Sequence, residues 1–134
     1  AKIGVKAKIV SYDWAEYLKR ASKGEHDAII VGWNGDNGDP DNWLGSLLSC
    51  KAVNGNNYAK WCNKDYDQAV TEARRITDHD QRVALYIKAQ QIFKQEVPWT
   101  IMAHPLESAL LSKNVHDFKI DPFGANRFEG VKID

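Results

Sequence analysis

The first third of the chain changes between strand-like and helix-like hydrophobic patterns. Residues 5–9 alternate apolar side chains with lysines, which is typical of a half-buried strand. Residues 14–21 repeat apolar side chains at helical spacing, and Gly24 is placed to end that helix. Residues 28–33, "AIIVGW", are almost continuously apolar, as in a strand buried on both faces. The order strand, helix, strand predicts a βαβ unit of an α/β protein.

The second half of the chain carries longer helical patterns. Residues 63–76 place apolar side chains on one helical face, and residues 78–96 do the same with one polar break. Asp78 and Gln81 have the spacing of a capping box, and Pro98 is expected to end the second helix. Shorter apolar runs predict strands at 99–104 and 108–112, with weak alternation in the tail from 114.

Composition narrows the class of protein. The chain has 134 residues, enough for one domain with a core. Its 18 basic and 18 acidic residues balance, so nucleic acid is not expected as a partner. No apolar run approaches the roughly 18 residues of a membrane span. The opening residues read as a helix end, a glycine cap at Gly4 and a strand, so any signal peptide is expected upstream.

The most polar segment follows the apolar run at 28–33. From Asp36 to Asn42 the sequence is "DNGDPDN", and no register of it fits the ligand positions of an EF-hand calcium loop. Asp39 and Pro40 are typical of an N-cap and the first residue of a helix. Asp36 has no such structural role, and it follows the end of a strand, where ligands of open α/β sheets bind. Asp36 is therefore a candidate to receive an ammonium group.

The sequence contains few candidates for catalytic motifs. There is no G-x-S-x-G elbow and no glycine-rich phosphate loop, and the four histidines are scattered. Cys50 and Cys62 flank a polar loop. Their spacing leaves two alternatives open: a disulfide, worth about 3 kcal/mol in the loop-entropy model, or two unrelated buried thiols. Further zinc ligands at suitable spacing are missing, so no metal site and no cofactor are expected.

Several stretches together resemble a known family. Residues 1–50 with their "VGWNGDNGDPDNW" segment, "NYAKWC" at 57–62 and "ITDHDQRVALYIKAQQIF" at 76–93 are similar to the C-terminal part of bacterial periplasmic dipeptide-binding proteins. These belong to the peptide and nickel family of extracellular solute-binding proteins. The resemblance implies part of a two-lobed, type II-like α/β receptor with a mixed sheet flanked by helices. Residues 1–113 would be the second half of one lobe, and residues 114–134 would return towards the other lobe.

The resemblance also implies a binding site. In such receptors the carboxylate just after the "GW" strand end holds the α-amino group of the peptide, which places that role on Asp36. Gly32 and Asn34 would contact the peptide backbone as an added strand does. Trp33 would border the ligand, although spacing alone leaves simple core packing of its ring equally open. The cysteines match a disulfide pair, Cys50–Cys62, in close relatives.

The implied function is transport. Such receptors are not enzymes; they deliver dipeptides in the periplasm to the inner-membrane permease of an ABC importer. The upstream part, with its cation for the peptide carboxylate, is absent here, so the isolated chain is expected to bind weakly or not at all. The alternatives are a receptor for another cargo (oligopeptide, modified peptide, haem or metal chelate) and an enzyme with a Cys–His pair. A third alternative is a calcium-stabilised carbohydrate module using Trp33, Trp43 and Trp61.

Overall fold

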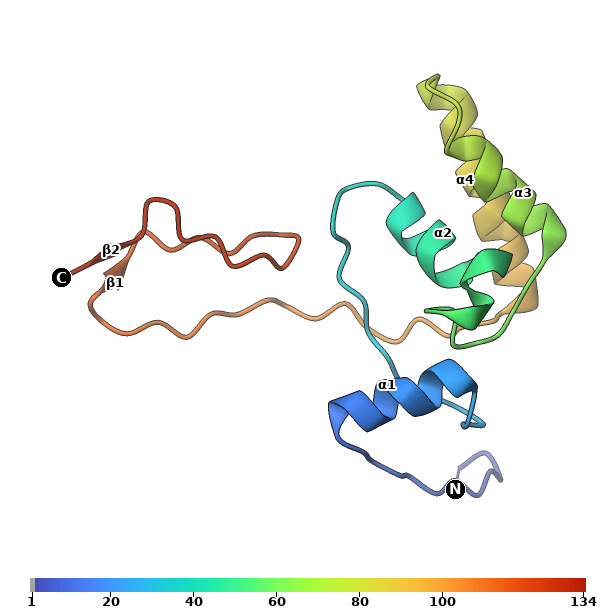
Figure 1. The fold of residues 1–134 in the computed structure, drawn as a ribbon, viewed down its shortest axis with the longest axis horizontal. Helices are drawn as coiled ribbons and strands as arrows, with labels where there is room; N and C mark the ends of the chain where they lie inside the picture. Colours follow the sequence, from blue (N-terminus) through green and yellow to red (C-terminus); the bar gives the residue numbers. More distant parts are fainter. Residues whose placement is uncertain (1) are drawn as a thin grey trace.

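The computed structural model describes residues 2–134, which form a helical body and a long extended tail (Figure 1). The tail carries a two-stranded antiparallel pair in which Val115 lies opposite Ile133. No helix among residues 2–134 has the length and apolar character needed to cross a bilayer. In chain order, the elements are α1 (Trp14–Lys23), α2 (Asp41–Leu48), the 3-10 helix η1 (Cys50–Asn54), α3 (Lys64–Ala73), α4 (His79–Glu96), β1 (Val115–His116) and β2 (Lys132–Ile133).

The helices form where their local signals predict them. The Asp13 carboxylate accepts the backbone N–H groups of Ala15 and Glu16 at the start of α1, and Gly24 ends that helix at φ 75°. Asp78 accepts the Gln81 N–H over 2.9 Å at the start of α4. These contacts satisfy N–H groups that a helix cannot satisfy internally, so residues close in sequence determine the helix bounds.

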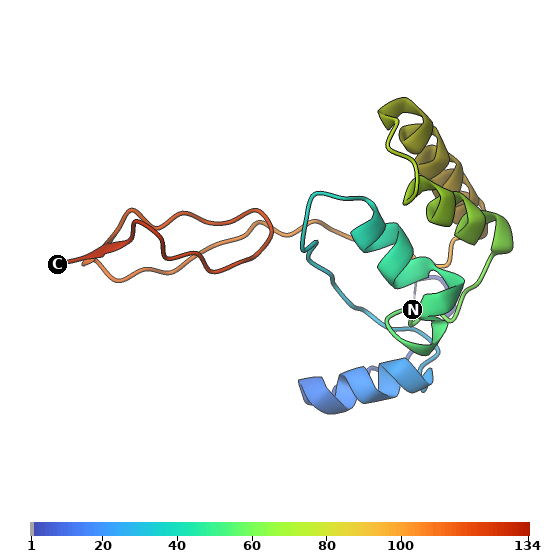
Figure 2. The same ribbon diagram turned by 45° about the horizontal axis from the view of Figure 1, so that its top comes forward.

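The core lies where α2, α3 and α4 meet. α3 and α4 pack along one another, and α2 lies across them (Figures 1 and 2). The Tyr66 side chain is fully buried, and its hydroxyl donates to the Leu44 carbonyl over 2.8 Å. This bond satisfies a polar group that would otherwise be costly to bury. The buried residues of the cluster are Leu47, Leu48, Tyr66, Ala69, Val70 and Ala89.

The predicted disulfide is confirmed. Cys50 and Cys62 are joined with an S–S distance of 2.06 Å, and no free cysteine remains. Inside the loop, Asn57 is fully buried and its amide donates to the Trp61 carbonyl over 2.7 Å. At the loop's start, the Cys50 N–H donates to the Asp67 carboxylate over 2.8 Å. The Cys–His enzyme is therefore wrong, because it requires a free thiol.

The predicted strands do not pair in this chain. Within residues 2–134 the segments 5–9, 28–33, 99–104 and 108–112 have no sheet partner, and β1–β2 is the only sheet. Ile9 is 94% exposed and Ile30 81% exposed, so "AIIVGW" is not a buried strand here. A strand needs a neighbour for its backbone and cover for its apolar side chains. Residues 5–9 and 28–33 therefore do not form the predicted βαβ unit among residues 2–134.

The tail approaches the polar turn that follows residue 33. Phe123 lies 3.8 Å from the position of a Cβ built on Gly38, and Gly124 faces the side chain of Asn34. Both views show the tail's loop returning towards the segment that leads into α2 (Figures 1 and 2). Two segments about 85 residues apart in sequence, 34–38 and 121–124, therefore lie together.

Candidate functional site

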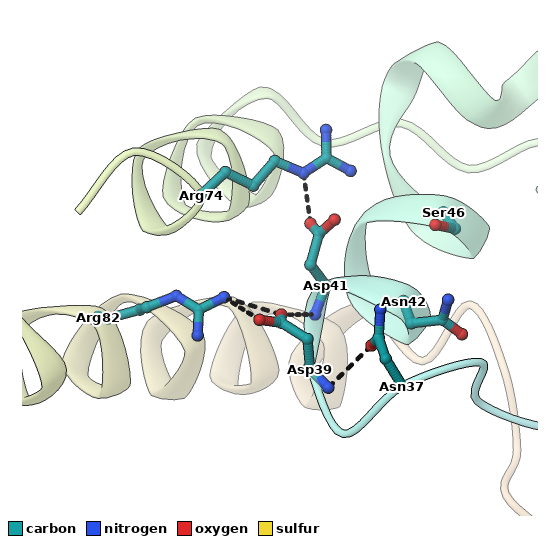
Figure 3. Close-up of a pocket in the computed structure, with 7 residues that line it drawn as sticks. All are labelled: Asn37, Asp39, Asp41, Asn42, Ser46, Arg74 and Arg82. Atoms are coloured by element: carbon teal, nitrogen blue, oxygen red, sulfur yellow. Dashed lines mark hydrogen bonds and ion pairs between the residues drawn. The ribbon is translucent and has the colours of Figure 1, made fainter. Parts of the chain in front are cut away.

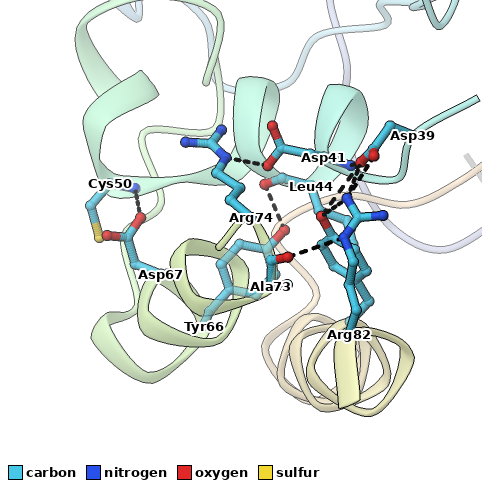
Figure 4. Close-up of polar contacts among 10 residues, drawn as sticks. Asp39, Asp41, Leu44, Cys50, Tyr66, Asp67, Ala73, Arg74 and Arg82 are labelled. Atoms are coloured by element: carbon cyan, nitrogen blue, oxygen red, sulfur yellow. Dashed lines mark hydrogen bonds and ion pairs between the residues drawn. The ribbon is translucent and has the colours of Figure 1, made fainter. Parts of the chain in front are cut away.

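The carboxylate of Asp39 fixes the start of α2 to the other helices. It accepts from Arg82 Nη2 at 2.6 and 2.8 Å and from the N–H of Asp41 at 2.8 Å (Figure 3). Arg82 Nε in turn donates to the carbonyl of Ala73, the last residue of α3, over 3.0 Å (Figure 4). The backbone bond from Asp41 and then the Arg82 guanidinium lower the pKa of Asp39.

This contact pattern refines the predicted helix start. α2 begins at Asp41, one residue later than expected, with Pro40 at the N-cap position. The Asp39 carboxylate nevertheless satisfies the first helical N–H, which confirms its role as a structural cap.

Asp41 is also committed to an arginine. Its carboxylate pairs with Arg74 Nε, and this pair holds the first turn of α2 against the end of α3 (Figures 3 and 4). The pair passes directly over Gly45, where a built Cβ would collide with both side chains. Glycine at position 45 is therefore what allows the two groups to meet.

Asp36 differs from the other two carboxylates of the turn. It is exposed, and among residues 2–134 no lysine, arginine or histidine pairs with it. Its Oδ2 accepts from the side-chain amide of Asn42 over 3.0 Å, and its N–H donates to Asn42 Oδ1 over 3.3 Å. The carboxylate is thus oriented by a neutral amide and not by a cation of residues 2–134.

Asn42 is the functional residue that sequence reasoning missed. Besides holding Asp36 at two points, its Oδ1 accepts from the indole Nε1 of Trp33 over 2.9 Å. Sequence reasoning placed Asn42 only as a dipole-compatible residue in the first helical turn. A polar side chain three residues after Asp39 has the capping-box spacing, and that spacing could have indicated a side chain reaching back into the preceding loop.

The remaining predicted site residues flank this arrangement. Gly32 and Asn34 are exposed, and within residues 2–134 no hydrogen bond uses their backbone N–H or C=O. Trp33 is half-buried and packs against the core cluster. The prediction that the Trp33 ring packs against the core is therefore confirmed. Its indole N–H also bonds to Asn42, the residue that holds Asp36. Whether Trp33 borders a ligand stays a prediction.

The turn does not gather metal ligands or an aromatic platform. Among residues 2–134 no three acidic, histidine or cysteine side chains converge to hold a metal ion. The open cavity of about 290 Å³ beside the turn is lined by the two ion pairs already described. Trp33 and Trp61 pack against the core cluster, so they are not available with Trp43 as a carbohydrate-binding surface.

Comparison with known proteins shows a similarity to bacterial solute-binding proteins. A family model described as bacterial extracellular solute-binding proteins, family 5 Middle, matches residues 1–55. The solved structures it resembles are periplasmic binding proteins, which defines the fold as a partial α/β lobe of that class. Residues 1–55 are therefore similar to that family, and nearly the whole chain is similar to curated di/tripeptide-binding proteins. The chain spans about a quarter of the length of the curated relatives it matches.

Individual relatives are similar along nearly the whole chain. Di/tripeptide-binding protein 1 of Pseudomonas aeruginosa is 56% identical over 133 residues, covering 99% of this chain and 25% of the relative. Heme-binding protein A of Haemophilus influenzae is 44% identical over 134 residues, covering 100% of this chain and 24% of the relative.

Two solved structures have the same fold. The dipeptide binding protein from a Pseudoalteromonas species in complex with Met-Leu has a TM-score of 0.89 and 35% identity, with 99% of this chain and 26% of that chain covered. The second structure is the ABC transporter-associated periplasmic binding protein DppA from Helicobacter pylori in complex with the peptide STSA. It has a TM-score of 0.85 and 34% identity, and the match covers 98% of this chain and 26% of that chain.

Proposed function

We propose that this chain is part of the substrate-binding component of an ABC importer for dipeptides, in which Asp36 captures the α-amino group of the peptide. The proposal rests on a difference among the three carboxylates of the turn. Asp39 and Asp41 are paired with arginines, whereas Asp36 is exposed, is held by the Asn42 amide and has no cationic partner among residues 2–134.

The chemistry of the turn suits a peptide amino terminus. A primary ammonium can donate charge-assisted hydrogen bonds to Asp36, each worth about 1.5–3 kcal/mol. The free backbone groups of Gly32 and Asn34 can pair with the peptide main chain as an added strand would. Backbone pairing does not depend on the peptide's side chains, so it supports a broad range of sequences.

The rest of the proposal concerns the whole receptor. It acts in the periplasm without enzymatic activity and passes its cargo to the inner-membrane permease. In it, residues 1–113 belong to one lobe and residues 114–134 return towards the other. The missing N-terminal part supplies the cation for the peptide carboxylate and the cover that the exposed strand segments lack. This chain alone is therefore expected to bind dipeptide weakly or not at all.

The test is dipeptide binding by the full-length protein carrying Asp36→Asn. Removing the charge leaves the ammonium unpaired, so the affinity should fall by roughly one to two orders of magnitude, equivalent to a few kcal/mol. Asp65→Asn is the matched control, because Asp65 is an exposed aspartate of α3 outside the turn. Isothermal titration calorimetry measures both variants. Equal affinities for wild type and Asp36→Asn would refute the role of Asp36.

The second candidate is a receptor for another cargo, and the 44% identity to a haem-binding protein favours keeping it. Asp36 distinguishes the two candidates because it needs a free amine. An N-acetylated dipeptide should fail to compete with a free dipeptide. Equal competition by the acetylated form would favour the second candidate.

A further inference from the structure

We propose that the tail turn, residues 121–124, positions the ligand turn, residues 34–38, and thereby sets the affinity of the site. This inference rests on the proposed function of Asp36. It assigns a positioning role to Phe123 and Gly124, two residues far in sequence from the residues that would contact a peptide.

The tail turn has a fixed shape of its own. The Asp121 carbonyl accepts the Gly124 N–H over 3.0 Å, which closes a tight turn. The Asp121 carboxylate accepts the Phe123 N–H over 2.7 Å and pairs with Arg127 over 2.6 Å. The Asp121 side chain is only 8% exposed, so this ion pair is shielded on one side. The turn can therefore act as a firm support.

The tail turn lies beside both ends of the ligand turn, within reach of an added Cβ. Gly124 has φ +74°, and a Cβ built on it would lie 3.1 Å from Asn34 Nδ2. At the other end, the Phe123 ring meets the position of a Gly38 Cβ at 3.8 Å. Pro122 and Phe123 also line an open cavity of about 340 Å³ together with Gly35 and other residues of the ligand turn.

Asp36 thus lies between two independent elements. Asn42 holds its carboxylate and N–H from the first turn of α2. The tail turn lies close to the flanking residues Asn34 and Gly38. A small shift of the tail turn would move Asn34, whose free backbone is proposed to pair with the peptide, while leaving the α2 contacts in place.

Two glycine variants of the full-length protein test the role. Gly124→Ala and Gly130→Ala both introduce a side chain at a left-handed φ, +74° and +82°, so both should lower the melting temperature similarly. A Cβ at Gly130 meets nothing within 4 Å, whereas one at Gly124 pushes on Asn34. Dipeptide affinity should fall about fivefold or more in Gly124→Ala only, the lower end of typical coupling between sites.

A rescue experiment separates positioning from general destabilisation. Asn34→Ala removes the Nδ2 atom that the new Cβ would meet. The double variant Asn34→Ala/Gly124→Ala should therefore bind as well as Asn34→Ala alone. Should Gly124→Ala fail to fold, Phe123→Ala gives the same readout without backbone strain, with the exposed Phe128→Ala as control.

The outcomes also distinguish this inference from the proposed function. Equal dipeptide affinity in Gly124→Ala and Gly130→Ala, or no rescue, overturns the inference when Asp36→Asn still weakens binding. If Asp36→Asn leaves affinity unchanged, the proposed function itself fails, and the inference that rests on it falls with it.

Discussion

Replacing Asn42 by alanine should weaken peptide binding more than its exposed surroundings suggest. The amide makes three hydrogen bonds: it accepts from Trp33 Nε1 at 2.9 Å and from the Asp36 N–H at 3.3 Å, and it donates to Asp36 Oδ2 at 3.0 Å. Alanine removes all of them and leaves the half-buried indole N–H of Trp33 without its protein acceptor.

The magnitude follows from these contacts. The bond to the indole is shielded and should contribute about 1 kcal/mol to the free energy of unfolding. The bonds to Asp36 are exposed, so water replaces part of them when they are lost. The Asp36 carboxylate is then less well oriented, which should make the binding free energy less favourable by about 1 kcal/mol. Since 1.4 kcal/mol corresponds to tenfold in affinity, dipeptide binding should weaken about fivefold.

The assay is calorimetry of dipeptide binding to the full-length protein, combined with urea denaturation. Asn37→Ala is the matched control: this neighbouring amide accepts only the Asp39 N–H over 2.9 Å and does not touch Asp36 or Trp33. If Asn42→Ala and Asn37→Ala have the same dipeptide affinity, Asn42 does not orient the carboxylate, and the description of the site is wrong.

Three further predictions concern the scaffold of the full-length protein. Replacing Cys50 and Cys62 by serine should lower the free energy of unfolding by about 3 kcal/mol in urea denaturation, because the open loop has more freedom in the unfolded chain. Asp39→Asn should destabilise the protein at neutral pH, and the difference should shrink in acid denaturation, as pH falls below the carboxyl's ordinary pKa of 3.8 and through its lowered folded value. Tyr66→Phe should cost about 1 kcal/mol on thermal denaturation, because the Leu44 carbonyl loses its buried donor.

Each scaffold prediction has its own contradicting result. Wild type and the serine variant must converge when both are measured under strong reductant; a persisting gap would point to packing instead of the cross-link. A stability difference for Asp39→Asn that grows on acidification would reverse the expected sign. For Tyr66→Phe, unchanged unfolding would mean that the hydroxyl bond contributes nothing.

The helices and caps could be predicted because their signals are local. Asp13, Gly24 and Asp78 act on residues within one helical turn, so a short window of sequence contains the information. Hydrophobic spacing then places Tyr66 on the buried face of α3. The same reasoning correctly identified Asp39 as a cap.

The strands could not be predicted in the same way because pairing is not local. The "AIIVGW" segment has the apolar character of a covered strand, but it has no sheet partner among residues 2–134, and Ile30 is 81% exposed. Apolar composition indicates that a segment is suited to a covered strand. It does not show that this chain supplies the cover. The pattern was correct about the requirement and wrong about the structure of residues 2–134.

The role of Asp36 stays a prediction, which rests on its place after a strand end, on the cap role of Asp39 and on the family resemblance. Sequence alone could not show which carboxylates find cations. Arg74 and Arg82 lie 33 and 43 positions from their partners, so no short spacing reveals them. The orientation of Asn42 depends on the fold of the loop that it faces. Long-range partners and side-chain direction are what the structure adds.

The two arginines determine the net charge of the turn. Three carboxylates and two guanidinium groups leave a formal charge of −1, and that charge is on Asp36. One ammonium neutralises it completely, whereas a divalent cation would leave an excess positive charge beside Arg74 and Arg82. If Asp36 binds as proposed, the two ion pairs would make the turn better suited to a singly charged amino terminus than to Ca²⁺.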